Sequence, residues 1–455
     1  MTSFFSEKPL IVSEDIQPAD INDYVTPIFY APNASWLVQR NGMDRQHSLM
    51  IALNGSEGNH MHANGISMEL YGKGYRLAPD AGIGYSLYSG LDYLEWYSQF
   101  PSHNTVCVDG ISSYPVMKSN HAFKLLSCYP ESGEKVTYPS VTYSNMYFRE
   151  PESKADQTRL MGIVTTSKTT GYYVDVFRSK KAEGGDKMHD YFYHNMGQIM
   201  NLTDSNGGDL NLQSTEELSF AGAHLYAYSY IYNKKSAETS KDIKATYTID
   251  VKEGDDVHMY MWMKGEENRK VFSALSPSTE GLSRLKDMPY NIKEQPTLTF
   301  IARQYGEAWS RPFVAIYEPS TDNEPGTIAN VSYPEVQSSS SSAIAIRVMH
   351  KNGREDYILS SDKADELCQS GNMNAKATYA LWSEIDGKDL LLFMGNGTKL
   401  EIPSLSIVCD KPTDVLLEKK DGDWWYTASN TCTLEVNKAK FILTPTVKPL
   451  KLKDF

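Results

Sequence analysis

The sequence predicts an all-β fold, a large antiparallel β-sandwich followed by a small C-terminal β-domain. The first observation behind this prediction is a two-residue alternation of apolar and polar side chains, clearest in Val257–Lys264, where Val257, Met259, Met261 and Met263 form a wholly apolar set. The second is that helical periodicity sustained over ten or more residues is nearly absent. The third is an abundance of Thr, Tyr and Val, which favour strands. Together they indicate antiparallel sheets packed face to face.

Short apolar or alternating runs follow one another along the chain, separated by Gly, Pro, Asn, Asp and Ser clusters, as expected for strands joined by turns. Besides Val257–Lys264, the predicted strands are Ala34–Arg40, Ile66–Tyr71, His103–Val108, Tyr172–Arg178, Ala223–Tyr232, Lys244–Val251, Thr297–Arg303, Phe313–Tyr317 and Ala343–Met349.

A chain of 455 residues is too long for one ordinary core and suggests two or three domains. We expect an N-terminal lead-in at 1–30, the sandwich at 31–350 and the small β-domain at 351–455. Turn sequences recur at hairpin spacing in the last region; they are Asp386-Gly387, Gly395-Asn396-Gly397 and Asp421-Gly422.

Composition excludes several classes of protein. Hydrophobic residues make up 40% and charged residues 22%, which is globular, and no apolar run approaches the roughly 20 residues of a membrane span. The net charge of −13 argues against a general nucleic-acid binder, which needs a basic surface. Five cysteines without CxxC spacing predict buried thiols and no disulfide framework. Residues 1–20 lack the basic and apolar regions of a signal peptide.

Two histidines and one carboxylate form a candidate metal site. His60 and His62 are two positions apart, so on a strand they would face the same side. Asp80 follows a predicted strand, and His103 precedes another. His62, Asp80 and His103 would make the imidazole and carboxylate set typical of zinc with an open position. Two polar strand residues without a metal are the alternative for the HxH pair.

These residues also carry a family resemblance. The run Asn59–Gly110 contains HMH, then ELYGKGYRLAPDAG, then HNTVCVDG, and Asp175–Arg178 and His189–His194 follow downstream. In this order, the segments resemble the C-terminal β-sandwich region of heparinase II/III-like polysaccharide lyases, a group that acts on heparin, heparan sulfate or alginate. The resemblance is clear over about residues 30–200 and looser to about 350.

The resemblance implies roles for individual residues. His62, Asp80 and His103 match the ligands of a structural zinc ion, and His60 matches the catalytic histidine facing the substrate cleft; a supporting role of the zinc in catalysis stays open. A tyrosine among Tyr85, Tyr88, Tyr93 and Tyr97 is expected to exchange protons, and we predict Tyr88. A purely structural role for Tyr88 stays open.

Arg178, His189 and His194 are predicted to line the substrate cleft. The alternative for the two histidines, that they pack as partly buried sheet residues, stays open.

The implied activity is β-elimination in a uronate-containing polysaccharide. An anionic substrate meets repulsion from a −13 chain, so we expect an alginate-like polymer in preference to heparin. Family members place an (α/α) toroid before this region, whereas about 35 residues precede Trp36 here. Two interpretations of the chain stay open. It is either a fragment that is inactive without its toroid or a relative of these lyases that consists of the β-region alone. The family suggests a periplasmic or secreted protein.

A second function stays open at this point, a non-catalytic glycan-binding or structural β-sandwich with a structural zinc. A glycoside hydrolase is least favoured, because no pair of carboxylates stands out in the sequence.

Overall fold

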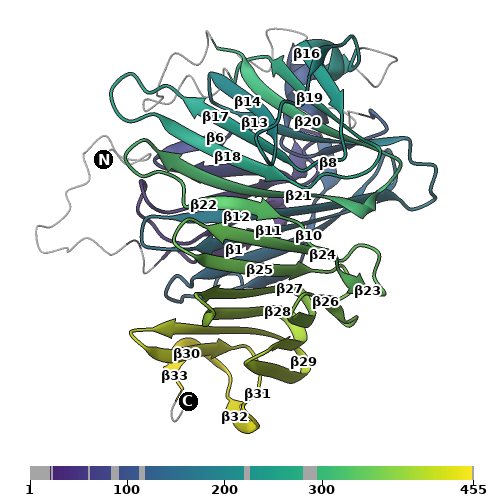
Figure 1. Cartoon of the computed structure of the whole chain (residues 1–455). Coiled ribbons are helices and arrows are strands. Elements are labelled where there is room, and N and C mark those ends of the chain that lie inside the picture. The colour runs from purple at the N-terminus through teal and green to yellow at the C-terminus, as the bar shows by residue number, and fades with distance from the viewer. Residues whose placement is uncertain are drawn as a thin grey trace, which may run out of the picture.

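The computed structural model describes residue 21 and residues 24–59, 62–82, 92–111, 118–219, 226–279 and 295–452. Nearly every element in this part of the chain is a strand, which confirms the predicted all-β class (Figure 1). Among the described residues, no helix has the length and hydrophobicity needed to cross a membrane.

An eight-stranded antiparallel sheet forms the central layer. In spatial order its strands are β14 (Ile199–Asp204), β17 (Ile243–Ile249), β18 (Val257–Met263), β21 (Ala308–Thr321), β12 (Gly171–Lys181), β11 (Ala155–Thr165), β10 (Val141–Glu150) and β9 (Lys124–Tyr129). Strand β12 shows why both faces of this sheet are apolar. Tyr172, Val174 and Val176 belong to one buried cluster, whereas Tyr173 and Phe177 belong to another. The sheet is therefore covered on both sides.

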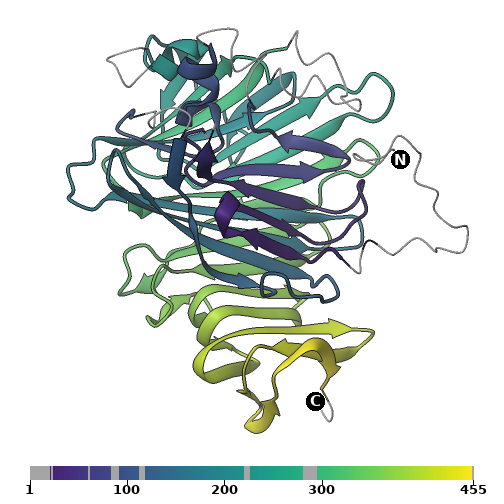
Figure 2. The ribbon, with the colours of Figure 1, turned by 180° about the vertical axis from the view of Figure 1, so that it is seen from behind.

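Two smaller sheets cover one face. The five-stranded sheet contains β1 (Ile28–Ala31), β2 (Trp36–Arg40), β3 (Met50–Asn54), β5 (Ser67–Gly72) and β6 (Tyr75–Ala78). The six-stranded sheet contains β15 (Gln213–Ser214), β16 (Tyr232–Glu238), β19 (Arg269–Ser276), β20 (Thr297–Tyr305), β13 (Met188–Asn195) and β7 (Val106–Val108). The purple N-terminal strands lie at the front of Figure 2. Residues of both sheets share one core cluster with the central layer.

A twelve-stranded sheet covers the other face and continues to the C-terminal end, yellow in Figures 1 and 2. Its main path contains β22 (Ile328–Ser332), β24 (Ile344–His350), β25 (Arg354–Ser360), β27 (Met373–Ile385), β28 (Lys388–Ile402), β29 (Leu405–Lys420), β30 (Asp423–Ala428) and β33 (Thr446–Lys451). The short strands β23 (Gln337–Ser338), β26 (Cys368–Ser370), β31 (Cys432–Val436) and β32 (Ala439–Leu443) pair beside this path. A two-stranded sheet, β4 (Ser56–Asn59) with β8 (Lys118–His121), completes the fold.

The predicted boundary at residue 350 lies in the turn between β24 and β25, which pair with each other in the twelve-stranded sheet. How the chain divides into independently folding units stays a prediction.

The strand prediction for Ala223–Tyr232 is wrong over its described part. Tyr226–Tyr230 forms a 3₁₀ helix, η5, and β16 begins at Tyr232. Tertiary contacts decide this conformation, since the Tyr228 hydroxyl donates a hydrogen bond to buried Asp190 and the Tyr230 ring stacks on Trp96.

Two expectations for the C-terminal region also need correction. Asp386-Gly387 and Asp421-Gly422 do form turns, but Gly395-Asn396-Gly397 lies inside β28 at a shift in register. A Cβ on Gly395 would lie 2.5 Å from the Tyr143 ring, so close approach of the chain explains this glycine. The expectation of buried thiols fails for Cys409 and Cys432, which form a disulfide between paired positions of β29 and β31.

Candidate metal centre

Three of the predicted ligands converge in space. His62 follows β4, Asp80 follows β6, and His103 ends a 3₁₀ turn, η4 (Phe100–Ser102). Potential ligand atoms of these three side chains all lie within 4.8 Å of one another. His103 Nδ1 lies 2.8 Å from Asp80 Oδ2, and the His62 and His103 rings are 5.4 Å apart. The sequence prediction that these residues form one cluster is confirmed.

Protonation in the cluster suits a cation. Burial, and then the neighbouring His103, lower the pKa of His62 to about 4, so this imidazole is neutral at neutral pH. Burial alone would raise the pKa of Asp80, but the charge of His103 and its hydrogen bond keep that pKa well below its ordinary value. A neutral imidazole and an ionised carboxylate are the forms that bind metals.

His103 offers a further observation. Its side chain is fully buried, and its Nε2 has no hydrogen-bond partner among the described residues. An unpaired buried ring nitrogen is unfavourable unless a ligand, ion or water satisfies it. Two imidazoles and a carboxylate are donors typical of zinc, so the residues fit the ion that the sequence predicts.

Asn104 connects the segments that carry the three residues. Its Nδ2 donates to Met68 O at 3.0 Å and to Pro79 O at 2.9 Å, next to Asp80. Its Oδ1 accepts the backbone N–H of His194 at 2.6 Å. Because Asn104 directly follows His103, one buried amide links the His103 turn to β5, to the residue before Asp80 and to β13.

A buried ion pair supports the same loops from the central sheet. Arg159 on β11 binds Asp175 on β12 through two hydrogen bonds of 3.0 and 2.6 Å. Arg159 Nη1 also donates to Ile66 O at 2.7 Å and to Asn104 O at 2.6 Å. The sheet thus fixes the backbone between His62 and β5 and the residue after His103.

Sequence reasoning missed Arg159 as a supporting residue, and it treated Asp175 and Asn104 only as parts of family motifs. A detectable sign was present, because Asp175 is the one charge within the apolar run Tyr172–Phe177 and Arg159 directly precedes the apolar residues Leu160 and Met161. A charge at such a position needs a buried partner.

The tyrosine loop is only partly described. His60 and Tyr88 lie outside the described residues, so their predicted roles stay predictions. Tyr93, in a π-helical turn (η3, Tyr93–Tyr97), places its ring 5.4 Å from that of His62. Its hydroxyl is buried and has no partner among the described residues. Burial raises the pKa of Tyr93, which favours the protonated phenol.

Arg178, His189 and His194 are all buried and bound to protein groups. Arg178 donates to the carbonyls of Ser342 and Ser360, on the side of the twelve-stranded sheet. His189 contacts Ser179 Oγ at 2.9 Å and Asp186 Oδ1 at 2.8 Å. The structure gives each of these two side chains an internal partner, and their contact with substrate stays a prediction.

His194 lies close to the cluster but supports it from the interior. Its Nε2 lies 2.9 Å from Pro101 O, so this nitrogen carries the proton, and Nδ1 accepts from Thr299 Oγ1 at 3.0 Å. Burial lowers the pKa of His194 to about 4. The neutral ring therefore holds the turn that leads into His103, and its predicted contact with substrate also stays a prediction.

Comparison with known proteins identifies a related family. Residues 25–221 match the family model "Heparinase II/III-like, C-terminal". This region belongs to the heparinase II/III-like family. The match contains all three residues of the metal cluster together with Asn104, Arg159 and Asp175.

One curated relative is similar over a longer part of the chain. An endo-acting ulvan lyase from Formosa agariphila is 27% identical over 414 residues, which cover 86% of this chain and 49% of the relative. The chain therefore spans about half the length of this relative.

Two solved structures align with part of the chain. Heparinase III aligns over 71% of this chain and 41% of its own, with 11% identity and a TM-score of 0.42. The heparan sulfate lyase HepC from Pedobacter heparinus aligns over 73% and 42%, with 14% identity and a TM-score of 0.38.

Proposed function

We propose that this chain is a polysaccharide lyase, or the β-rich part of one, that cleaves a uronate-containing polysaccharide by β-elimination. The observation that carries the proposal is the convergence of His62, Asp80 and His103 inside a region that matches the heparinase II/III-like family. The similarity to an ulvan lyase supports the same class of reaction.

The proposed cofactor is zinc held by His62, Asp80 and His103. When bound, the ion would link the three loops and add positive charge beside the substrate face. His60 precedes His62 by two residues, so a metal-fixed His62 would restrict the position of His60 as well. A histidine has a pKa near ~6.5, which suits a base that removes the C5 proton of the uronate.

The leaving O4 needs a proton donor. Tyr88 is the residue predicted from the sequence, and Tyr93 is the described tyrosine that lies against the cluster. The raised pKa of Tyr93 keeps its phenol protonated, which suits an acid in preference to a base. Tyr93 is therefore a second candidate for the proton donor.

The proposed substrate is an alginate-like polyuronate in preference to heparin. The net charge of −13 repels every polyanion, and it repels a densely sulfated one most strongly. Export to the periplasm or outside the cell is proposed as well. The Cys409–Cys432 disulfide supports it, because disulfides persist in oxidising compartments.

The experiment measures the absorbance of unsaturated uronate after incubation with alginate, ulvan and heparin. The zinc-loaded chain is assayed alone and joined to any toroid encoded before it. We expect product from a uronate polymer, more from alginate than from heparin, and none after His60→Ala. A zinc-loaded protein that binds saccharide without forming unsaturated product in either form would instead establish the non-catalytic glycan-binding alternative.

A further inference from the structure

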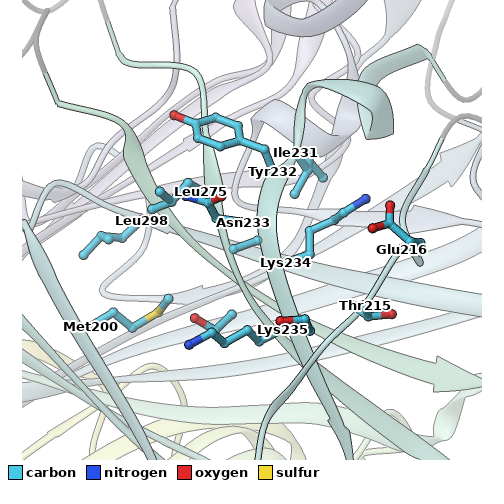
Figure 3. A pocket seen from close by; sticks show the side chains of 13 residues that line it. Met200, Thr215, Glu216, Ile231, Tyr232, Asn233, Lys234, Lys235, Leu275 and Leu298 are labelled. Carbon is cyan, nitrogen blue, oxygen red and sulfur yellow. The ribbon is translucent and has the colours of Figure 1, made fainter.

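A cavity lies in the six-stranded sheet, and none of the three residues of the candidate metal centre lines it. Its volume is ≈ 740 Å³, within the range of about 300–1,000 Å³ typical of ligand pockets. Apolar side chains form its centre and polar groups surround them (Figure 3). Its lining includes Tyr232, Lys234, Lys235, Glu216, Leu275 and Leu298.

A β-bulge creates the arrangement of the polar groups. The pairing of β16 with β19 shifts register between Tyr232 and Lys235, and Asn233 has a φ of 50°. Lys234, inside the bulge, and Lys235, where regular pairing resumes, both belong to the cavity lining. In the view of Figure 3, the Tyr232 ring lies above Leu275 and Leu298 and the Lys235 side chain lies below them. The exposed Tyr232 ring and the Lys235 side chain thus lie on opposite sides of these two leucines.

The charges in the cavity are unbalanced. Its lining contains two lysines and one glutamate. Figure 3 shows Lys234 directed to the side where Glu216 lies and Lys235 extending away from it. On the same sheet, Lys270 is paired with Glu217 and Glu238, whereas the described residues form no ion pair with Lys235. A positive site of this kind, in a chain of net charge −13, is suited to an anionic ligand.

The aromatic side chain of Tyr232 indicates which kind of uncharged group the ligand carries beside its anion. Tyr232 is 44% exposed, so its ring is open to stacking. Tyrosine offers an apolar face and a polar tip, which together match a sugar ring and its hydroxyls. Ser214, Thr215 and Ser273 add hydroxyls to the lining that can exchange hydrogen bonds with such a ligand.

A packed path connects this cavity with the metal cluster. The His62 ring contacts Tyr93 at one end of the π-helical turn η3. Trp96 of the same turn stacks on Tyr230, and Tyr230 Oη donates to Glu95. Tyr230 immediately precedes Ile231 and Tyr232 of the cavity lining. The two sites are therefore attached to neighbouring elements.

We infer that this cavity is a binding site for a pyranose that carries an anionic substituent, a carboxylate or a sulfate, with the ring on Tyr232 and the anion on Lys235. Binding here breaks no bond and needs no metal, so the inference goes beyond the proposed lyase activity.

The test is a calorimetric titration of the full chain with three tetrasaccharides. An alginate tetrasaccharide carries carboxylates only, a κ-carrageenan tetrasaccharide carries sulfates only, and cellotetraose is neutral. The titrations use Asp80→Asn protein, so that the substrate is not consumed. We expect binding of at least one anionic saccharide, weakened by added salt, and no comparable binding of cellotetraose. The saccharide that binds more tightly identifies the anionic group.

Two variants test the named contacts. Lys235→Ala and Tyr232→Ala should each weaken binding about tenfold, as expected for loss of a charge-assisted hydrogen bond or of ring stacking. Both side chains are exposed, so little effect on folding is expected. Lys168→Ala and Tyr305→Ala are matched exposed controls away from the cavity and should bind as the parent does.

Unchanged affinity in both cavity variants, or equal affinity for cellotetraose, would overturn the inference. Failure of the lyase proposal has a different signature, because wild-type protein would then bind the anionic saccharide here and form no unsaturated product.

Discussion

At the scale of single residues, the metal cluster depends on one carboxylate between two imidazoles. Asp80 lies 2.8 Å from His103 and accepts a hydrogen bond from the backbone of Gly82 at 2.9 Å. The low pKa of Asp80 keeps it ionised over the working range of most proteins. We expect the charge of Asp80, more than the shape of its side chain, to attract the proposed zinc ion.

Asp80→Asn tests this statement, because it removes the charge and keeps the size. We expect zinc affinity to fall by more than about 100-fold, since loss of a supporting residue alone costs 10–100-fold. Metal content after dialysis and competition with a chromophoric chelator provide the measurement. Asp44→Asn, an exposed carboxylate beside His47, is the matched control. Equal zinc content in Asp80→Asn and in the wild type would remove Asp80 from the ligand set.

At the scale of elements, strands β11 and β12 hold loops that are distant in sequence. The Arg159–Asp175 pair is fully buried, and its guanidinium reaches the carbonyls of Ile66 and Asn104. The Asp175 carboxylate also accepts from Tyr191 on β13. These contacts connect the central layer to both sides of the metal cluster.

Arg159→Met should destabilise the fold by about 3–5 kcal/mol, because it leaves the Asp175 charge buried and unpaired. Adding Asp175→Asn removes that charge and should recover much of the loss. Neither variant restores the hydrogen bonds to Ile66 and Asn104, so zinc affinity should stay about 10–100-fold low in both. Denaturant unfolding and zinc competition give the two measurements. A double variant with wild-type zinc affinity would show that other contacts suffice to hold the loops.

At the scale of the whole molecule, the central sheet and the twelve-stranded sheet meet at a carboxyl group. Asp414 on β29 accepts from Tyr143 Oη of β10 at 3.3 Å and from the backbone of Asn396 at 2.8 Å. Burial raises the pKa of Asp414 to about 6. Ionisation of this group therefore opposes the packing of two layers at neutral pH.

The pH dependence follows from the sign of this shift. An unfolded aspartate has a pKa of about 4, so the folded state holds the proton more tightly. The stability contributed by Asp414 is fully present below pH ~4 and is lost as the pH rises through ~6. Asp414→Asn should match the wild type near pH 4 and exceed it by about 2 kcal/mol at pH 7.5. Denaturant unfolding at both pH values provides the comparison.

Asp386→Asn, in an exposed turn, is the control and should show no such difference. A constant gap between Asp414→Asn and the wild type at both pH values would contradict the raised pKa.

The fold class and most strands were predictable because each depends on local pattern. The alternation in Val257–Lys264 became β18, and the predicted strand Ile66–Tyr71 became β5. The helical turn at Tyr226–Tyr230 was not predictable, because contacts of Tyr228 with Asp190 and of Tyr230 with Trp96 fix it. Gly395-Asn396-Gly397 looked like a hairpin turn, but close packing on Tyr143 explains its glycine.

The β class and the candidate ligand set His62, Asp80 and His103 could be predicted from the sequence, because side-chain period and donor chemistry are visible in short segments. How three layers stack, where Arg159 and Asn104 direct their hydrogen bonds, and that a bulge interrupts the pairing of β16 beside Lys235 became visible only in the folded chain. These features depend on strands that pair across long separations and on the burial that their pairing creates, and neither is encoded in any short segment.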